Sequence, residues 1–201
     1  MKKHSTAAML AAAAIMLAAS PGFAAKSYKY YTKVSGKYAM MGDMDITNRL
    51  QVDSDEGYGF AGAIGTKMEA FRIEVELGTQ KNDINALEVG DDKVAFAQSG
   101  DTRIDTALIN AYFDIPLSSG FSLYAGGGAG AAMVTVNLYD LDSDDTVFAY
   151  KFEAGVSYAF TPQMGADLGY EYLATEDVEL DHIEVKDISS NNVVLAFKYM
   201  F

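Results

Sequence analysis

The last eleven residues of the chain, 191–201, constrain its fold more than any other stretch. They read NNVVLAFKYMF, in which every second residue from Val193 to Phe201 is large and apolar. Side chains along a β-strand point alternately to its two faces, so one face is wholly apolar and ends in aromatic residues, while Lys198 lies on the other. Chain termini of soluble proteins are usually polar and loose. The pattern instead predicts a strand with lipid on one side and a polar interior on the other.

Seven earlier stretches also have strand character. The clearest is 71–77, in which four large apolar residues alternate with Arg72, Glu74 and Glu76. The stretch 121–136 is rich in Gly and Ala, which lets a strand bend or pack closely. With the terminal strand, these stretches predict eight strands, the first seven covering residues 28–41, 57–66, 71–77, 102–114, 121–136, 147–160 and 164–175.

The connections between these strands alternate in length. Residues 66–70, 115–120 and 161–163 are short turns, whereas 43–56, 78–101, 137–146 and 175–187 are long. The long connections hold 20 of the 28 acidic residues and four basic ones, a net charge of −16. Short periplasmic turns, long outer loops and phenylalanines beside the turns are typical of an eight-stranded antiparallel up-and-down transmembrane β-barrel. We therefore predict that fold, with an acidic outer surface.

A soluble eight-stranded calyx of the lipocalin kind also alternates along its strands. Its apolar face would point inward and its polar face outward. In this chain the polar face holds few charges per strand, of both signs, and the aromatic face recurs in nearly every strand. This pattern favours the membrane barrel.

The N-terminal residues predict export. Lys2 and Lys3 precede an apolar segment, residues 7–19, which is too short to span a bilayer. A secretory signal peptide is therefore expected over residues 1–24, cleaved after Ala24, with the barrel domain over 25–201. The formal net charge of −13 argues against a nucleic-acid partner, because phosphate contacts need a basic surface. The expected location is the outer membrane of a Gram-negative bacterium.

Four segments carry a resemblance to a known family: YYTKVSGKYAMM at 30–41, GYGFAGAIGTK at 57–67, INAYFDIPL at 109–117 and FSLYAGGGAGAA at 121–132. In their order and spacing, with the terminal Phe, they resemble the opacity and surface-antigen type of small outer-membrane barrel, which is similar to the OmpA transmembrane domain. The resemblance implies insertion by the barrel-assembly machinery.

The assembly signal of that family has a polar residue, a glycine and two terminal hydrophobic residues. Tyr199 and Phe201 match the hydrophobic positions, whereas Val194 and Ala196 replace the polar residue and the glycine. The family includes adhesins, immune-evasion proteins and structural barrels.

Charged residues on the inward-facing positions are the first candidate site. Buried charges must be paired and hydrogen-bonded, which predicts a salt-bridged plug that fills the barrel. A gated narrow pore is the alternative, since small inward residues in 57–66 and 121–136 leave room for water, although eight strands enclose little space. The predicted lumen charges are Arg72, Glu74, Glu76, Lys151, Glu153, Asp167, Glu171 and Lys198.

A second candidate is a divalent-cation site in the third long connection, formed by Asp140, Asp142, Asp144 and Asp145. The run resembles the start of a calcium loop. The sixth and twelfth positions hold Asp145 and Lys151 instead of Gly and Glu, so it is not an EF-hand. A looser cation site, bridging these carboxylates and those of Asp177, Glu179 and Asp181 to lipid phosphates, competes with a merely solvated acidic loop.

An enzyme is not expected. Lipid-modifying barrels need a His with a nucleophilic Ser and an acidic partner. His182 is the only His after the signal segment, and the residues that follow it, Ile183 to Val185, do not match the deacylase pattern His-x-Ser-Asn. No cofactor is predicted.

The predicted function is that of a monomeric outer-membrane barrel with a structural and surface-interaction role, as an adhesin or in envelope integrity, through its acidic loops. Its expected partners are outer-membrane lipid, lipopolysaccharide and a host or matrix ligand. The alternative is a narrow porin-like channel for small solutes or ions.

Overall fold

A computed structural model describes residues 29–41, 44–47, 50–89, 92–138, 141–176, 178–180, 183–185 and 188–201. The predicted signal peptide lies outside this part of the chain. The described residues form β1 (Lys29–Met41), β2 (Met44–Thr47), β3 (Leu50–Met68), β4 (Phe71–Val89), β5 (Asp92–Pro116), β6 (Phe121–Leu138), β7 (Leu141–Ala159), β8 (Met164–Thr175), β9 (Val178–Leu180), β10 (Ile183–Val185) and β11 (Ser189–Met200). None of them forms a helix long and apolar enough to cross a membrane.

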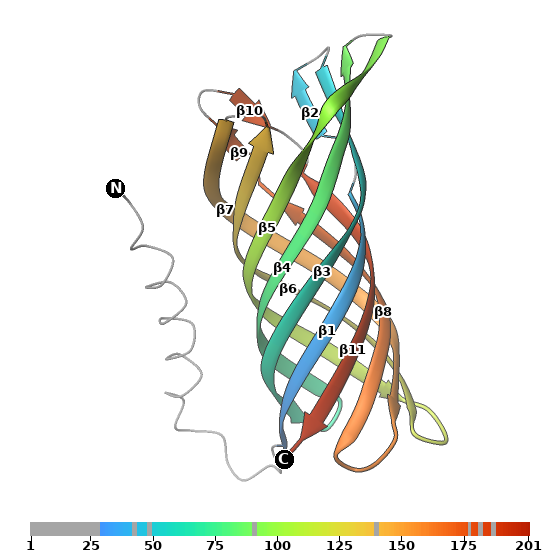
Figure 1. Cartoon of the computed structure of the whole chain (residues 1–201). Helices are drawn as coiled ribbons and strands as arrows, with labels where there is room; N and C mark the ends of the chain where they lie inside the picture. The colour runs from blue at the N-terminus through green and yellow to red at the C-terminus, as the bar shows by residue number, and fades with distance from the viewer. Residues whose placement is uncertain are drawn as a thin grey trace.

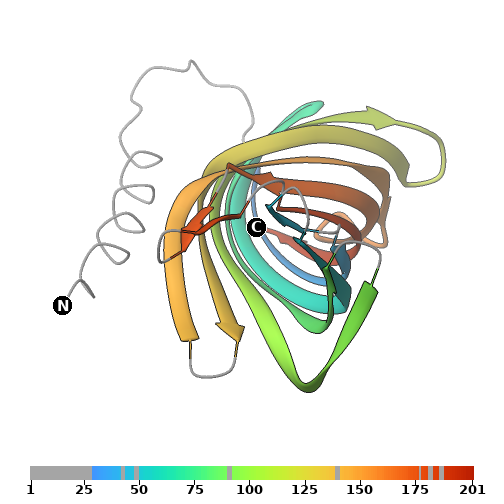
Figure 2. The same cartoon turned by 90° about the horizontal axis from the view of Figure 1, so that it is seen from above.

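Eight of the strands close into a barrel. β1, β3, β4, β5, β6, β7, β8 and β11 pair antiparallel in chain order, and β1 pairs with β11 to complete the ring. β2 pairs with the start of β3, while β9 and β10 form a separate hairpin. Figure 1 shows the tilted strands and Figure 2 the closed wall seen from above. The predicted eight-stranded antiparallel up-and-down barrel is confirmed.

The wall is apolar outside and mostly polar inside. In β11, Val193 and Leu195 are 43% and 49% exposed, whereas the intervening Val194 and Ala196 are buried. The same alternation leaves large apolar side chains on the outside of each of the eight barrel strands, as expected for a surface that lipid covers. The phenylalanines predicted to form a girdle beside the short turns are all exposed: Phe71, Phe113, Phe121, Phe160 and Phe201.

One end of the barrel carries the three short turns, and we call it the short-turn end. β3 and β4 are joined at Glu69–Ala70, where Glu69 has a φ of 53°. β5 and β6 are joined over residues 117–120, where Gly120 has a φ of 82°. β7 and β8 are joined over 160–163, where the Thr161 hydroxyl accepts a hydrogen bond from the Met164 N–H at 3.0 Å. The chain also ends here (Figure 1).

The opposite end differs from the sequence prediction, which placed long loops there. The strands instead continue past the membrane wall as hairpins: β4 runs to Val89 and β5 resumes at Asp92, while β6 runs to Leu138 and β7 resumes at Leu141. A ladder needs only the backbone N–H and C=O groups of neighbouring strands. The loss of apolar alternation therefore marked where the strands leave lipid and not where they end. We call this the long-hairpin end, and the β4–β5 hairpin reaches furthest (Figure 1).

Candidate functional site

The barrel interior gathers the charged residues that the sequence assigned to it. All eight predicted lumen residues are buried inside the wall, and so are Lys33, Lys37 and Asp114, with Lys67 half-buried beside them. We call these twelve side chains the interior network. It holds six cations and six carboxylates, so its formal charge is zero.

The eight residues chosen from the sequence carry a net charge of −2. The cations Lys33 and Lys37 and the pair Lys67–Asp114 were missed, although Lys33 and Lys37 directly precede the outward-facing Val34 and Tyr38 in β1. A requirement for charge balance would have found them, because an uncompensated buried charge is strongly destabilising.

The network is divided into two clusters, and the first lies at the short-turn end. Arg72 Nε donates to Asp114 Oδ1 at 2.9 Å, and Lys67 Nζ donates to Asp114 Oδ2 at 2.6 Å. Arg72 Nη1 lies 3.4 Å from Asp167 Oδ2, while Lys198 Nζ lies 2.7 Å from Asp167 Oδ1. Five side chains from five strands are thus tied across the barrel.

The second cluster surrounds Lys151 near the middle of the barrel. Lys151 Nζ lies 2.8 Å from Glu76, 2.9 Å from Glu171 and 3.4 Å from Glu153. Lys37 of β1 also binds Glu171, at 2.7 Å, across the intervening strand β11. On the same level, Lys33 forms ion pairs with Glu74 and Glu76.

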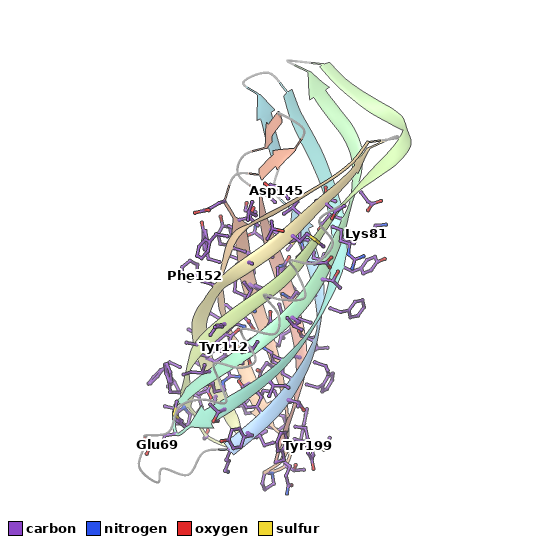
Figure 3. All side chains as sticks on the ribbon, turned by 90° about the vertical axis from the view of Figure 1, so that its left-hand side faces the viewer. Glu69, Lys81, Tyr112, Asp145, Phe152 and Tyr199 are labelled. Atoms are coloured by element: carbon purple, nitrogen blue, oxygen red, sulfur yellow. The ribbon has the colours of Figure 1, made fainter. Side chains whose placement is uncertain are left out.

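Two tyrosine hydroxyls complete the hydrogen bonding of the Glu153 carboxylate. Tyr112 and Tyr124 each donate to one oxygen of Glu153 at 2.8 Å. Their ring centroids lie 5.0 and 5.1 Å from the Arg72 guanidinium carbon, which adds cation–π attraction. Lys198, another of the predicted lumen charges, binds Asp167 and the Ser157 hydroxyl. Tyr112 lies at mid-height inside the barrel in Figure 3.

Glycines of β6 make room for these side chains. Tyr112 lies directly opposite Gly126, and Asn110 directly opposite Gly128. A Cβ at Gly126 would lie 2.6 Å from the Tyr112 ring, and one at Gly128 would lie 1.8 Å from Asn110 Oδ1. The small inward residues of 121–136, which had predicted room for water, are therefore covered by their β5 neighbours.

Toward the long-hairpin end the interior mixes buried apolar side chains with neutral polar ones. Ile104, Leu108, Val134 and Ile188 are each at most 2% exposed. Ile188 precedes β11, and its carbonyl accepts a hydrogen bond from the Thr175 N–H at 3.0 Å, which fixes the chain at the barrel mouth. Gln80, which is opposite Ile104 in the ladder, donates hydrogen bonds to Asn82 and Ser190, both at 2.9 Å. Alternation did not single out the buried aliphatic residues, because β5 carries aliphatic residues on both faces.

The predicted divalent-cation site falls largely outside the described residues. Asp140 is not among them, and of Asp142 and Asp144 only the backbone is described, within β7. Asp145 is half-buried, and its Oδ1 accepts a hydrogen bond from the Thr146 N–H at 2.7 Å. Among the residues whose side chains are described, no group of three or more His, Cys, Asp or Glu is placed to hold a metal ion. The cation site stays a prediction.

Some of the remaining candidate residues also lie outside the described part of the chain, and others lie within it. His182, Asp177 and Asp181 lie outside the described residues, and of Glu179 only the backbone in β9 is described. By contrast, the predicted assembly residues are well placed at the short-turn end. They are the outward-facing Tyr199 and Phe201, which are 52% and 67% exposed, with ring centroids 6.5 Å apart. Figure 3 shows Tyr199 at this end of the barrel.

Relatives match parts of the chain. A protein of Brucella abortus, described as uncharacterized, is 34% identical over 103 residues, covering 44% of this chain and 36% of its own length. A protein of Rickettsia conorii, whose name describes it provisionally as an adhesin, is 25% identical over 142 residues, covering 62% of this chain and 57% of its own length. The chain thus spans between about a third and somewhat over half of these relatives.

Solved structures share the fold. Neisserial surface protein A superposes with a TM-score of 0.63 at 20% identity, covering 87% of this chain and 99% of that one. Ail, the attachment invasion locus protein of Yersinia pestis, superposes with a TM-score of 0.53 at 15% identity over the same shares. At these identities the likeness shows the fold alone.

The family is shown by the sequence itself. A family model described as "Outer membrane protein beta-barrel domain" matches residues 9–201, nearly the whole chain. Together with the closed eight-stranded wall and its apolar outer face, this match settles both the family and the membrane. The chain belongs to the outer membrane protein beta-barrel domain family and is a small barrel of the Gram-negative outer membrane.

Proposed function

We propose that this protein is a plugged membrane anchor that presents its acidic hairpins to the outside, with an adhesive and envelope-stabilising role. The observation that carries this proposal is the interior network, in which six cations and six carboxylates occupy the lumen. A lumen filled in this way serves rigidity better than transport, since eight strands enclose a space that side chains can fill.

The hairpins supply the interacting surface. The connections at the long-hairpin end carry a net charge of −16, and the described parts of these hairpins extend beyond the membrane wall. The name of the Rickettsia relative, which describes it provisionally as an adhesin, points in the same direction. We infer lipopolysaccharide and a host or matrix protein as ligands, with a monomeric barrel inserted by the barrel-assembly machinery.

A binding screen tests the proposal. Refolded barrel is measured against lipopolysaccharide and host matrix proteins, beside a variant in which residues 84–100 are replaced by a two-residue turn. Binding should fall in the variant while the barrel itself stays folded. A matched control replaces the turn residues 117–120 at the opposite end and should bind normally. Equal binding by all three proteins would reject the hairpins as the recognition surface.

Divalent cations are part of the same proposal. Hard cations take carboxylate and phosphate oxygens and would relieve repulsion between the hairpins and lipid phosphates, which acts over a Debye length of ~10 Å at 0.1 M salt. Calorimetry should show lipopolysaccharide binding that rises with millimolar Ca²⁺. Replacing Asp140, Asp142, Asp144 and Asp145 together with Asn should reduce that rise. If titration with Ca²⁺ gives no heat either with or without lipopolysaccharide, these carboxylates are merely solvated.

A narrow channel is the second candidate, and one observation favours it. Arg72 Nη2 is buried without a hydrogen-bond partner among the described residues, and such an atom is a natural position for water inside the lumen. Planar-bilayer recordings separate the two functions. If the protein is a plugged anchor, the recordings should show no single-channel conductance steps. Conductance steps whose size changes when Lys151 is replaced with Met would establish that ions pass through the network.

A further inference from the structure

Two basic residues stand side by side on the outside of the barrel wall. Lys81 of β4 and Arg103 of β5 are directly opposite in the ladder. The Lys81 side chain is 44% exposed and that of Arg103 is 55% exposed. They are distinct from the interior network, whose cations point into the lumen. Two adjacent cations on the outer wall are unusual in a region whose connections are otherwise strongly acidic.

The ladder register places this pair at the membrane–water boundary. Lys81 is opposite Tyr58 of β3, which is in turn opposite Tyr38 of β1, and both tyrosines are exposed. Exposed tyrosines gather at the level of lipid headgroups. Leu77 lies four residues before Lys81 on the same face of β4, farther from the long hairpins. It is 48% exposed and faces the lipid chains. Figure 3 shows Lys81 on the wall near the long-hairpin end, above the level of Phe152.

Two carboxylates accompany the cations on the same face. Lys81 Nζ lies 3.6 Å from Asp101 Oδ1, and Arg103 Nε lies 3.0 Å from Asp105 Oδ2. Exposed ion pairs of this kind contribute little to stability. Lys81 and Arg103 can therefore readily give up their hydrogen bonds to the aspartates and donate to a phosphate instead. An Arg side chain binds a phosphate with two parallel hydrogen bonds.

We propose that Lys81 and Arg103 form a lateral site for a phosphorylated lipid of the outer leaflet. Lys81 and Arg103 bind a phosphate of the lipid A headgroup, which takes the place of their aspartate partners. Tyr58 lies beside the sugar–acyl boundary of the same lipid. The site lies on the wall and not on the hairpin tips, so it stands whether or not the hairpins bind a host ligand.

The test measures lipid A binding by detergent-purified, delipidated full-length barrel, using native mass spectrometry to count bound lipid. The double variant Lys81→Gln with Arg103→Gln should bind lipid A roughly tenfold more weakly, as expected when charge-assisted hydrogen bonds to phosphate are lost. Lys29→Gln is the matched control, because Lys29 is an exposed cation at the short-turn end of β1. It should bind as the unmodified protein does.

Further measurements separate the parts of the site. Asp101→Asn with Asp105→Asn should not weaken lipid A binding, because these aspartates pair with Lys81 and Arg103 and do not contact the lipid. Dephosphorylated lipid A should bind as weakly as lipid A binds to the double variant. Inorganic phosphate should not compete at millimolar concentration, because it lacks the acyl chains that the wall contacts.

Three results would overturn the proposal. One is equal lipid A binding by the double variant and Lys29→Gln. Another is equal binding of phosphorylated and dephosphorylated lipid A to the unmodified protein. The third is full competition by inorganic phosphate, which would identify a site for the free anion and not for a lipid.

Discussion

Gly126 illustrates how single residues decide the packing of the barrel interior. It lies on the inner face of β6 opposite Tyr112, whose hydroxyl holds Glu153. A Cβ at this position would come within 2.1 Å of the Ala111 carbonyl oxygen as well as striking the Tyr112 ring. The backbone carbonyl cannot move aside as a flexible side chain can. Glycine is therefore required here by close approach and not by turn geometry.

The first prediction concerns this glycine. Gly126→Ala should lower the free energy of unfolding by about 1–3 kcal/mol, because it overpacks a filled interior. Gly62→Ala is the matched control: Gly62 lies on a barrel strand with open space where its Cβ would be, so the change should stay within about 0.5 kcal/mol. Urea unfolding of both variants from lipid vesicles makes the comparison. Equal effects would show that the β5–β6 contact is not as close as described.

The second prediction uses neighbours that face opposite ways. Phe152 is 62% exposed on the lipid side of β7. Phe152→Arg should destabilise the barrel by roughly 2–4 kcal/mol in bilayers, since a charge near the midplane loses its hydration. Phe152→Leu, which keeps an apolar side chain, should be nearly neutral. If the Arg variant unfolds at the same urea concentration as the Leu variant, Phe152 does not face lipid.

Glu153, the next residue, tests the interior instead. It is 5% exposed and bonded to Lys151 and two tyrosines. Glu153→Gln keeps the shape but leaves the network with one excess positive charge, which should cost about 1–3 kcal/mol. The loss should be largely recovered by adding Lys151→Met, which removes the excess charge. An additive double variant would argue against coupling of the two residues.

At the scale of elements, β11 closes the wall between β1 and β8, and its last contacts are made at the short-turn end. The Phe201 N–H donates to the Tyr30 carbonyl at 3.0 Å, beyond the last ladder residue of β11. The Phe201 ring stands in the lipid interface beside Tyr199. The final residue therefore contributes to closure of the barrel as well as to its predicted recognition during assembly.

The third prediction follows from this position. Deleting Phe201 should cause the chain to accumulate in the periplasm and be degraded, seen as loss of the protein from isolated outer membranes. Phe160→Ala is the control, because Phe160 is also an exposed aromatic at the short-turn end but lies outside the closing strand. It should assemble at normal levels. Normal surface levels of the deletion variant would disprove a role for Phe201 in assembly.

At the scale of the whole molecule, closure and charge balance act together. Every strand of the ring has two neighbours, so no backbone edge of the wall is left for unfolding to start from or for another chain to pair with. Inside, the cations and carboxylates link strands that are distant in sequence, such as Lys37 and Glu171. The barrel should therefore unfold as one unit.

The fourth prediction is heat-modifiability. The folded barrel should resist SDS at room temperature and migrate differently from the boiled chain on a gel. Replacing Glu76 and Lys151 together with Gln and Met should lower the temperature at which the folded band disappears, because both sit at the centre of the network. Identical migration of boiled and unboiled samples, after refolding verified by circular dichroism, would contradict a closed barrel.

Alternation alone was enough to predict the number, order and facing of the eight strands, because lipid outside and polar side chains inside impose a period of two. It also placed Arg72, Glu74 and Glu171 inside the wall. The ends of the outer hairpins could not be predicted in this way, since strands that have left the lipid keep their backbone ladder without an apolar face. β3, for example, begins at Leu50, seven residues before its alternation does.

Only the tertiary structure decided which buried groups meet. Partners such as Lys37 and Glu171, or Tyr112 and Glu153, lie far apart in the chain and come together through the stagger of strands around the closed ring. The same stagger brings Lys81 beside Arg103 on the outer wall. Sequence parity determines the face on which a residue lies, whereas its height and its neighbours depend on the register of every strand between them.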